Sequence, residues 1–303
     1  MLKSFFTNGF RPLPVGRLEW LIIRIAFASL VFYDLIDTNP YGYTAQKSPV
    51  GIAKFIDLTW LHLDWARPAI LVLAGIACLA YIAGRGLAIT LPALLVLSTL
   101  VRTYHNSQGF QDHSHQLIAL TLLAQSIVVW VFLVRRWKKL PTPSLTDRIN
   151  EHSWLLYYSQ GIIASTYVVA AMSKLMRSTG MWVINSPYIA FDIVKAQRQN
   201  YYKYLDDSLA GDPEKAVWVL ENQNIARLMF GGAFFLELFA LIALKNRMWA
   251  LLTGLSLIIL HRSIKWMMGL NFATAELLLL VFFINVPFWI HWAANRHKNP
   301  LEK

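Results

Sequence analysis

Long apolar segments separated by short polar ones recur along the whole chain, and they limit what it can fold into more than any other feature. Hydrophobic residues make up 56% of the 303 residues, charged residues only 15%, and the mean hydropathy is +0.43. Soluble domains carry about 25% charged residues. Because a helix satisfies its own backbone hydrogen bonds in lipid, the sequence predicts an all-α, polytopic membrane protein. We expect a single domain, a transmembrane helical bundle over residues 1–303.

The basic residues predict how this bundle is oriented. The formal net charge is +11, but Lys and Arg flank the apolar segments, as orientation signals and contacts with anionic lipid do. We therefore exclude nucleic acid as a partner and expect membrane lipid. The strongest basic cluster is RRWKK at 135–139, and the positive-inside rule places it in the cytoplasm.

Alternation from that cluster predicts eight transmembrane helices with both termini in the cytoplasm. Residues 52–65 are expected to form an amphipathic helix in the membrane plane, and residues 177–227 an external insertion with one or two amphipathic helices. Arg24 and Asp34 lie near opposite ends of the first span, so both are expected to reach an interface without pairing. The predicted spans are 20–35, 69–83, 87–100, 116–134, 154–175, 228–244, 249–261 and 271–292.

Lys174 stands near the end of the fifth span, where a lysine in lipid is costly. A lysine there can extend its stem to the headgroups and need no partner. The predicted topology, however, places other ionisable residues in the same leaflet, and Tyr167, seven residues before Lys174, shares its helix face. The residues expected at this depth are His113, Tyr167, Lys174, Glu237, His261 and Glu276.

Acids, imidazoles and an amine at one depth can shift one another's proton affinity, which proton transfer requires. Lys174 between apolar walls and a second cation would act as a base, whereas beside Glu237 it would stay charged and orient an anion. Glu237 is equally consistent with a structural partner of Lys174, and Glu276 with a hydrogen bond between helices.

A metal site and a cysteine redox pair are not expected. His113 and His115, with His105 nearby, lack a third ligand at the helical spacing of di-iron membrane enzymes, so no metal site is predicted. Cys78 is the single cysteine and lies in an apolar segment, which excludes a disulfide framework and a CxxC pair.

Three separated motifs occur in an order that resembles the HTTM domain, the membrane domain of vitamin K-dependent gamma-carboxylase and its small bacterial relatives. They are DHSHQLIAL at 112–120, YVVAAMSKL at 167–175 followed by Trp182, and ELFALIALKNRMWALLTGLSLIILH at 237–261 followed by a last helix with Met, Phe and Glu. The resemblance covers nearly the whole chain.

The resemblance implies a catalytic site of His113, Lys174 and His261, facing the outside of a bacterial cytoplasmic membrane. It also implies reduced vitamin K or another quinol as cofactor, with quinol oxygenation driving carboxylation. We add Tyr167, Trp182, Glu237 and Glu276 as substrate-binding residues. Two departures, AAMSKL in place of a Gly-Lys-Lys form and the lack of the family's large lumenal domain, favour a quinol or lipid-like substrate over a glutamate side chain.

Two other functions compete with an enzyme. The first is a non-catalytic membrane factor that uses the 177–227 insertion in maturation, export or immunity of a secreted peptide or protein, as in the small relative that helps mature a sporulation-delaying peptide toxin. The second, a transporter, is disfavoured because the sequence has no internal repeat and no pair of broken helices. If Lys174 is catalytic, Lys174→Ala should abolish activity with little loss of stability, because a lysine at a helix end contributes little packing.

Overall fold

The computed structural model describes residues 10–37, 45–109, 115–141, 149–205 and 213–295, and every regular element in these ranges is helical. In chain order the elements are α2 (Arg17–Asp37), η2 (Gly51–Lys54), η3 (Thr59–His62), α3 (Ala66–Ala83), α4 (Leu87–Asn106), α5 (Gln116–Trp137), α6 (Glu151–Arg177), α7 (Trp182–Asn185), η4 (Ser186–Tyr188), α8 (Ile189–Tyr204), α9 (Pro213–Glu221), α10 (Gln223–Leu238), η6 (Ala240–Lys245), α11 (Arg247–Met268), α12 (Ala273–Leu279), the π-helical turn η7 (Leu280–Ile284) and α13 (Val286–Asn295). The all-α prediction is confirmed for this part of the chain.

All eight segments predicted as spans are helical, and in the described ranges five helices are long and apolar enough to cross a membrane. Two predicted spans are divided: α10 has 16 residues and continues as the 3₁₀ helix η6, and the predicted span 271–292 contains α12, the π-helical turn η7 and the start of α13. The five helices that meet both criteria are Ala66–Ala83, Leu87–Asn106, Gln116–Trp137, Glu151–Arg177 and Ala273–Ala294.

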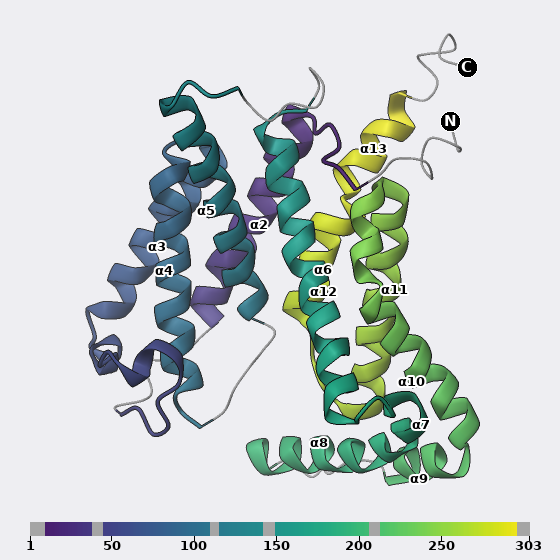
Figure 1. Ribbon diagram of the computed structural model, residues 1–303. Helices are drawn as coiled ribbons and strands as arrows, with labels where there is room; N and C mark the ends of the chain where they lie inside the picture. The colour runs from purple at the N-terminus through teal and green to yellow at the C-terminus, as the bar shows by residue number, and fades with distance from the viewer. Residues whose placement is uncertain (1–9, 38–44, 110–114, 142–148, 206–212, 296–303) are drawn as a thin grey trace.

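The long helices form two groups that lie side by side (Figure 1). The first contains α2 to α5, and the second contains α6 and α10 to α13. Helix α6 packs against α5 of the first group, and α2 contacts α12, η7 and α13 of the second. These contacts join the two groups into one continuous hydrophobic core that includes Trp20, Phe27, Leu122, Ile163 and Phe282.

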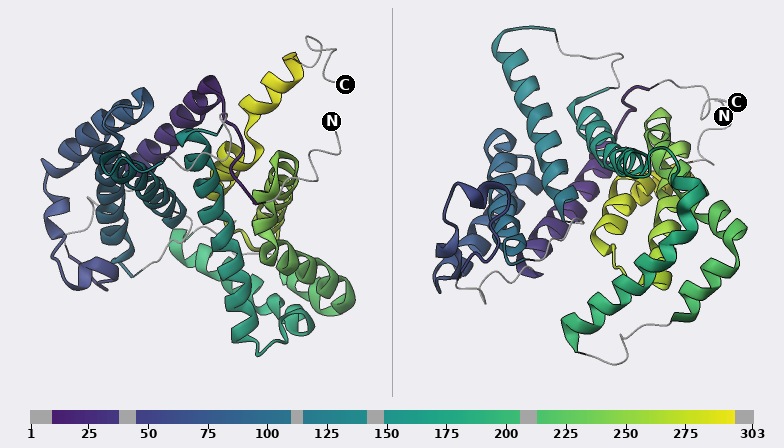
Figure 2. Two further views of the ribbon diagram at one scale, coloured as in Figure 1. Left: turned by 45° about the horizontal axis from the view of Figure 1, so that its top comes forward. Right: turned by 60° about the horizontal axis from the view of Figure 1, so that its bottom comes forward.

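Helices α8 and α9 run across one end of the second group (Figures 1 and 2). They pack on each other and against α10 and α11, around buried Ile193, Val219 and Met267. The described part of the 177–227 insertion therefore contains helices of the predicted kind. On α8, Phe191 and Tyr202 remain exposed.

Residues 52–65 do not form the predicted amphipathic helix, because they contain the two short 3₁₀ turns η2 and η3. The Asp57 carboxylate accepts a hydrogen bond of 2.9 Å from the Thr59 backbone N–H. An aspartate that bonds nearby backbone in this way favours a turn over a continuing helix. Leu58 and Leu61 are nevertheless buried, so the apolar spacing correctly indicated a packed face.

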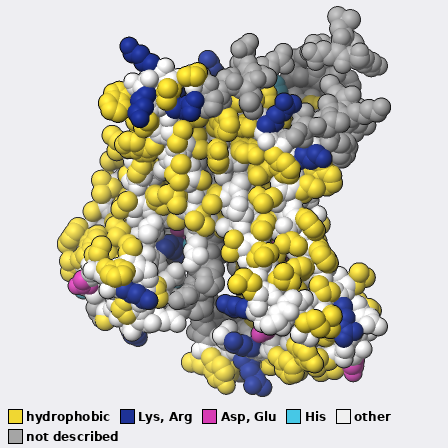
Figure 3. Space-filling view, viewed as in Figure 1, with side chains coloured by type: hydrophobic (Ala, Val, Ile, Leu, Met, Phe, Trp, Pro, Cys, Tyr) yellow, Lys and Arg dark blue, Asp and Glu magenta, His cyan; other side chains and the backbone are white. Residues whose placement is uncertain are grey.

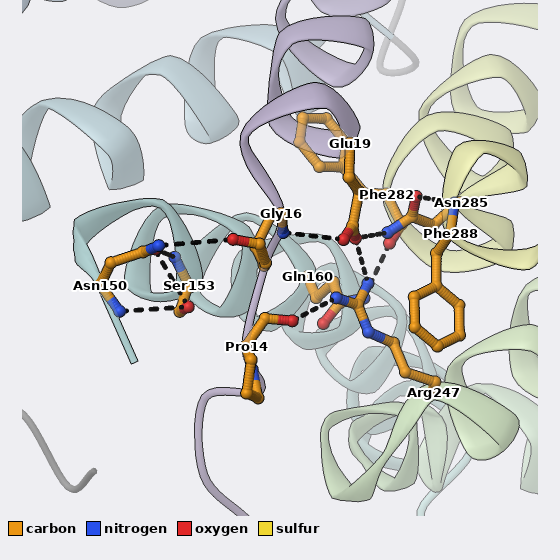
Figure 4. Close-up of polar contacts among 11 residues, drawn as sticks. Pro14, Gly16, Glu19, Asn150, Ser153, Gln160, Arg247, Phe282, Asn285 and Phe288 are labelled. Atoms are coloured by element: carbon orange, nitrogen blue, oxygen red, sulfur yellow. Dashed lines mark hydrogen bonds and ion pairs between the residues drawn. The ribbon is translucent and has the colours of Figure 1, made fainter. Parts of the chain in front are cut away.

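A polar cluster closes the opposite end of the bundle (Figure 4). Glu19 of α2 lies 2.8 Å from Arg247 at the start of α11 and accepts a 2.6 Å hydrogen bond from Asn285. Arg247 also donates to the Pro14 carbonyl at 3.0 Å. Nearby, Gln160 of α6 donates to the Phe282 carbonyl at 2.7 Å inside the π-helical turn. Polar side chains thus hold together the segments where α2, α11 and α13 begin.

Apolar side chains cover the band between the two ends on the face shown in Figure 3, and most of the visible Lys and Arg side chains lie towards the upper and lower ends. The exposed apolar residues include Val72 and Ile76 on α3 and Ile127 and Val131 on α5. This distribution is what a surface in contact with lipid requires.

Candidate functional site

Lys174 is paired rather than simply extended towards the membrane surface. Its ammonium contacts the Glu237 carboxylate, and its Nζ lies 5.6 Å from the centre of the Trp182 ring. The Lys174 side chain is 31% exposed and that of Glu237 only 9%. Of the two environments predicted for this lysine, the structure has the one beside Glu237. In the pair the ammonium donates and the carboxylate accepts.

The end of α6 explains how Trp182 reaches this pair. After Arg177 the chain turns through Thr179 and Gly180, whose φ angles are +50° and +84°, and the Gly180 N–H donates to the Leu175 carbonyl at 2.9 Å. A residue with positive φ after the last turn is a common way to end a helix. Because the chain reverses here, the short helix α7 begins with Trp182 next to Lys174.

Glu237 lies on the buried face of α10. Gly231, Phe234 and Glu237 are buried at a spacing of three residues, so they share this face. A Cβ at Gly231 would lie 3.0 Å from a methyl group of Val183, which shows how closely α7 approaches α10. The small side chain therefore lets α7 and Trp182 pack beside the helix that carries Glu237.

A cavity of about 650 Å³ lies beside the ion pair. Lys174, Trp182 and Glu237 form part of its wall, while α8 contributes Asp192 and Lys195. Most other lining residues are apolar, and they come from α8, α10, α11 and the segment before α12: Ile189, Ala196, Met229, Phe230, Ala233, Leu260, Ile264, Met267, Met268, Leu270 and Phe272.

Tyr167 and His261 meet each other but contact the cavity indirectly. The Tyr167 hydroxyl lies 3.3 Å from His261 Nε2, and the His261 ring stacks on Phe272 with centroids 4.9 Å apart. Phe272 lines the cavity, whereas His261 is 5% exposed and is not part of the described wall. Tyr167 and His261 are neighbours, but the expectation that both line one cavity with Lys174 and Glu237 is wrong for the described wall, because Phe272 lies between them and the cavity.

Glu276 has a partner that was not predicted. Its carboxylate is 2.5 Å from Arg262, and the Glu276 side chain is buried while that of Arg262 is exposed. Arg262 directly follows His261 in the sequence. This charge in the last third of α11 was the signal from which a partner for Glu276 could have been predicted. Glu276 belongs to this ion pair rather than to the described cavity wall.

His113 lies outside the described residues. Its neighbour His115 contacts Asp34, which also pairs with Arg102 through a 3.1 Å bond from Nε. Asp34 is 2% exposed. The prediction that Asp34 reaches an interface unpaired is therefore wrong, because α4 and α5 cover this end of α2.

Among the described residues no group of three His, Cys, Asp or Glu side chains is close enough to hold a metal ion. No protein family model, no curated protein and no solved structure matches this chain. The resemblance to the HTTM domain therefore stays a prediction from the quoted motifs. The ion pair, the aromatic ring over it and the apolar cavity are the features from which a function can be argued.

Proposed function

We propose that the chain is an integral protein of a bacterial cytoplasmic membrane, with eight crossings, both termini in the cytoplasm and the Lys174 cavity on the external side. The length of α6 supports this arrangement. Glu151 at its start contacts Arg136 of the basic cluster, and Lys174 follows 23 residues later. At 1.5 Å per residue this separation is about 35 Å, which is close to the thickness of a bilayer's hydrocarbon core plus part of its headgroup layer.

We further propose that the cavity binds a quinol or a similar lipid-like molecule and that the protein is an enzyme of the oxygenating or carboxylating type. The observation that carries this proposal is the Lys174–Glu237 ion pair at the wall of a largely apolar cavity of about 650 Å³. Small-molecule sites typically have volumes of about 300 to 1,000 Å³, apolar walls and a few polar groups that orient the ligand. The lining therefore fits an aromatic head with an isoprenoid tail.

When bound, a quinol supplies a ring that reacts with molecular oxygen, and the family resemblance implies that this reaction drives addition of carbon dioxide. Glu237 is positioned to accept a proton at a carboxylate oxygen, and the Lys174 ammonium to stabilise negative charge beside it. The Trp182 ring lies over the Lys174 amine, and Phe272 forms part of the same cavity wall. His261 and Tyr167 support Phe272 from behind, and His113 remains the second imidazole implied by the resemblance.

Binding of menaquinone-4 to purified protein in lipid nanodiscs tests the proposal. The wild-type protein should be stabilised against thermal unfolding by this quinone and should convert the reduced form to an epoxide in air, as followed by chromatography. A double variant, Lys174→Met with Glu237→Leu, removes both charges at nearly constant volume and should fold but lose binding and conversion. Retained binding and conversion by this folded variant would refute the assignment.

A matched control separates this effect from a general loss of positive charge. Lys54→Met changes an exposed lysine in η2, which packs against α4 and contributes no residue to the cavity lining. This control should bind and convert quinone like the wild type. Absence of any quinone effect on the wild-type protein itself would also count against the enzyme proposal.

One observation favours the alternative, a membrane factor for a secreted peptide or protein. A second hollow of about 640 Å³ lies between α9 and α11 and shares Met229 and Met267 with the first cavity. It contains Trp218 and Trp266 together with the charged groups of α9. Under this alternative, Trp218→Ala would abolish biological function while the variant lacking the Lys174–Glu237 pair retained it.

A further inference from the structure

A third hollow lies between α5 and α6 and has no residue in common with the Lys174 cavity. Its volume is about 630 Å³. The α5 wall is apolar from Leu120 to Phe132, and the α6 wall carries Gly161 and Ile162 next to a group of aromatic side chains. Ile127 and Val131 are 55% and 47% exposed, so the groove is open on the side of α5 that faces away from the core.

The groove has the length of a lipid chain. Its α5 wall extends from Leu120 to Arg135, which corresponds to about 22 Å at 1.5 Å per residue. One leaflet of the hydrocarbon core is about 15 Å thick. An acyl chain that begins near Arg135 would therefore contact the groove over its whole length.

The groove also has a charged mouth. Arg135 lines it and donates to the Pro141 carbonyl at 3.1 and 2.8 Å through Nε and Nη2. These bonds use two of the five N–H donors of a guanidinium group. Lys138 and Lys139 are exposed immediately after it. The mouth can thus donate hydrogen bonds to a phosphate and attract further negative charge.

Aromatic side chains face Arg135 from the other wall. Trp154 and Tyr158 stack with ring centroids 6.0 Å apart, and Tyr157 packs edge-on against Trp154 at 6.5 Å. All three line the groove. Tyr and Trp are enriched where acyl chains meet headgroups, because one part of each ring is apolar and the other forms hydrogen bonds. This composition fits a mouth at headgroup depth.

We propose that this groove is a binding site for one anionic phospholipid of the leaflet on the Arg135 side, with an acyl chain along α5 and α6 and the phosphate at Arg135. A second copy of the chain is the weaker occupant, because a two-fold contact through the groove would bring two basic clusters of residues 135–139 together. The proposal requires that α5 and α6 cross the membrane, and it does not depend on the chemistry of Lys174.

Native mass spectrometry of protein released from nanodiscs of equal phosphatidylglycerol and phosphatidylcholine tests this site. The wild-type protein should retain phosphatidylglycerol in preference to phosphatidylcholine by about fivefold, the effect of roughly one basic contact at a membrane surface. Arg135→Gln should reduce this ratio to near one. Arg85→Gln, which removes an exposed charge in the turn between α3 and α4, should leave the ratio unchanged.

Filling the groove provides a second, independent readout. Ala124→Trp should reduce retention of both lipids, and Val131→Trp should do the same at an exposed wall position that tolerates a larger side chain. Ile89→Trp, on the exposed face of α4 outside the groove, is the matched control and should not change retention. Thermal unfolding of each variant confirms that it folds.

Three results would overturn the proposal. The first is a wild-type protein with no preference for phosphatidylglycerol. The second is unchanged retention in both groove-filling variants. The third is a lipid-free dimer that Val131→Trp converts to a monomer, since the groove would then be a contact between copies of the chain.

Discussion

The Lys174 ammonium and the Glu237 carboxylate, 63 residues apart in the sequence, form an ion pair between the last turn of α6 and the last turn of α10. The Trp182 ring covers the amine, and an apolar cavity lies beside the pair. A lysine that ends a membrane helix needs no partner when it reaches water. Here it has one, so its substitution affects a second, more deeply buried charge.

Breaking this pair should destabilise the protein more than removing both partners. Lys174→Met leaves the Glu237 carboxylate buried without its cation and should lower the free energy of unfolding by about 1 to 3 kcal/mol. The double variant with Glu237→Leu should recover most of this loss. Urea or thermal unfolding of the two single variants and the double variant measures the coupling. Additive losses would show that the two residues are not coupled, whereas a Lys174→Met variant as stable as the wild type would confirm the sequence-based expectation of little loss in stability.

Arg247 should be among the most sensitive positions for stability. It is buried, pairs with Glu19 and lies 4.5 Å from the centre of the Phe288 ring. Arg247→Met leaves Glu19 with Asn285 as its remaining side-chain partner, and we expect a loss of about 3 kcal/mol. Arg247→Lys keeps the charge but loses the planar guanidinium donors, so its stability should lie between that of the wild type and that of Arg247→Met. Equal stability of Met and Lys variants would contradict this account.

Two glycines provide a matched test of helix packing. A Cβ at Gly254 of α11 would lie 2.8 Å from Cβ of Phe283 in the π-helical turn. Gly254→Ala should therefore destabilise the protein by about 1 to 3 kcal/mol. A Cβ at Gly232 of α10 meets no atom within 4 Å, so Gly232→Ala should be neutral or stabilising by up to about 1 kcal/mol. Similar unfolding midpoints for the two variants would refute the close contact of α11 with the turn.

Reporter fusions test the proposed topology. Fusions after Asn106 and Gly211 should report the external side, and fusions after Pro141 and Lys298 the cytoplasm. The physical reason is the concentration of basic residues next to the second pair of positions, including the cluster at 135–139. A cytoplasmic signal at Gly211 would invert the topology and remove the argument that the Lys174 cavity faces outward.

The sequence alone determined the class of fold and the neighbourhood of the candidate site. The apolar segments with basic flanks predict helices of the length and composition that membrane proteins use, and in the described ranges five helices meet those criteria. The expectation that Tyr167, Lys174, Glu237 and His261 lie near one another followed from the cost of charge in lipid. The cost of a charge in lipid depends on how far the residue lies from the helix end, and this distance can be read from the sequence.

Only the tertiary structure decided which of these residues touch. Depth does not specify the rotation of one helix against another, so the pairing of Lys174 with Glu237 and the separation of His261 from the cavity by Phe272 depend on packing. The same holds for Arg262 beside Glu276 and for Asp34 beside Arg102. In residues 52–65 the Asp57 carboxylate accepts a hydrogen bond from the Thr59 backbone N–H, and this local bond competes with the helix that the apolar spacing favoured. The periodicity of apolar residues indicates which face of a segment is buried. The tertiary packing decides which side chains contact that face and whether the backbone is α-helical or 3₁₀.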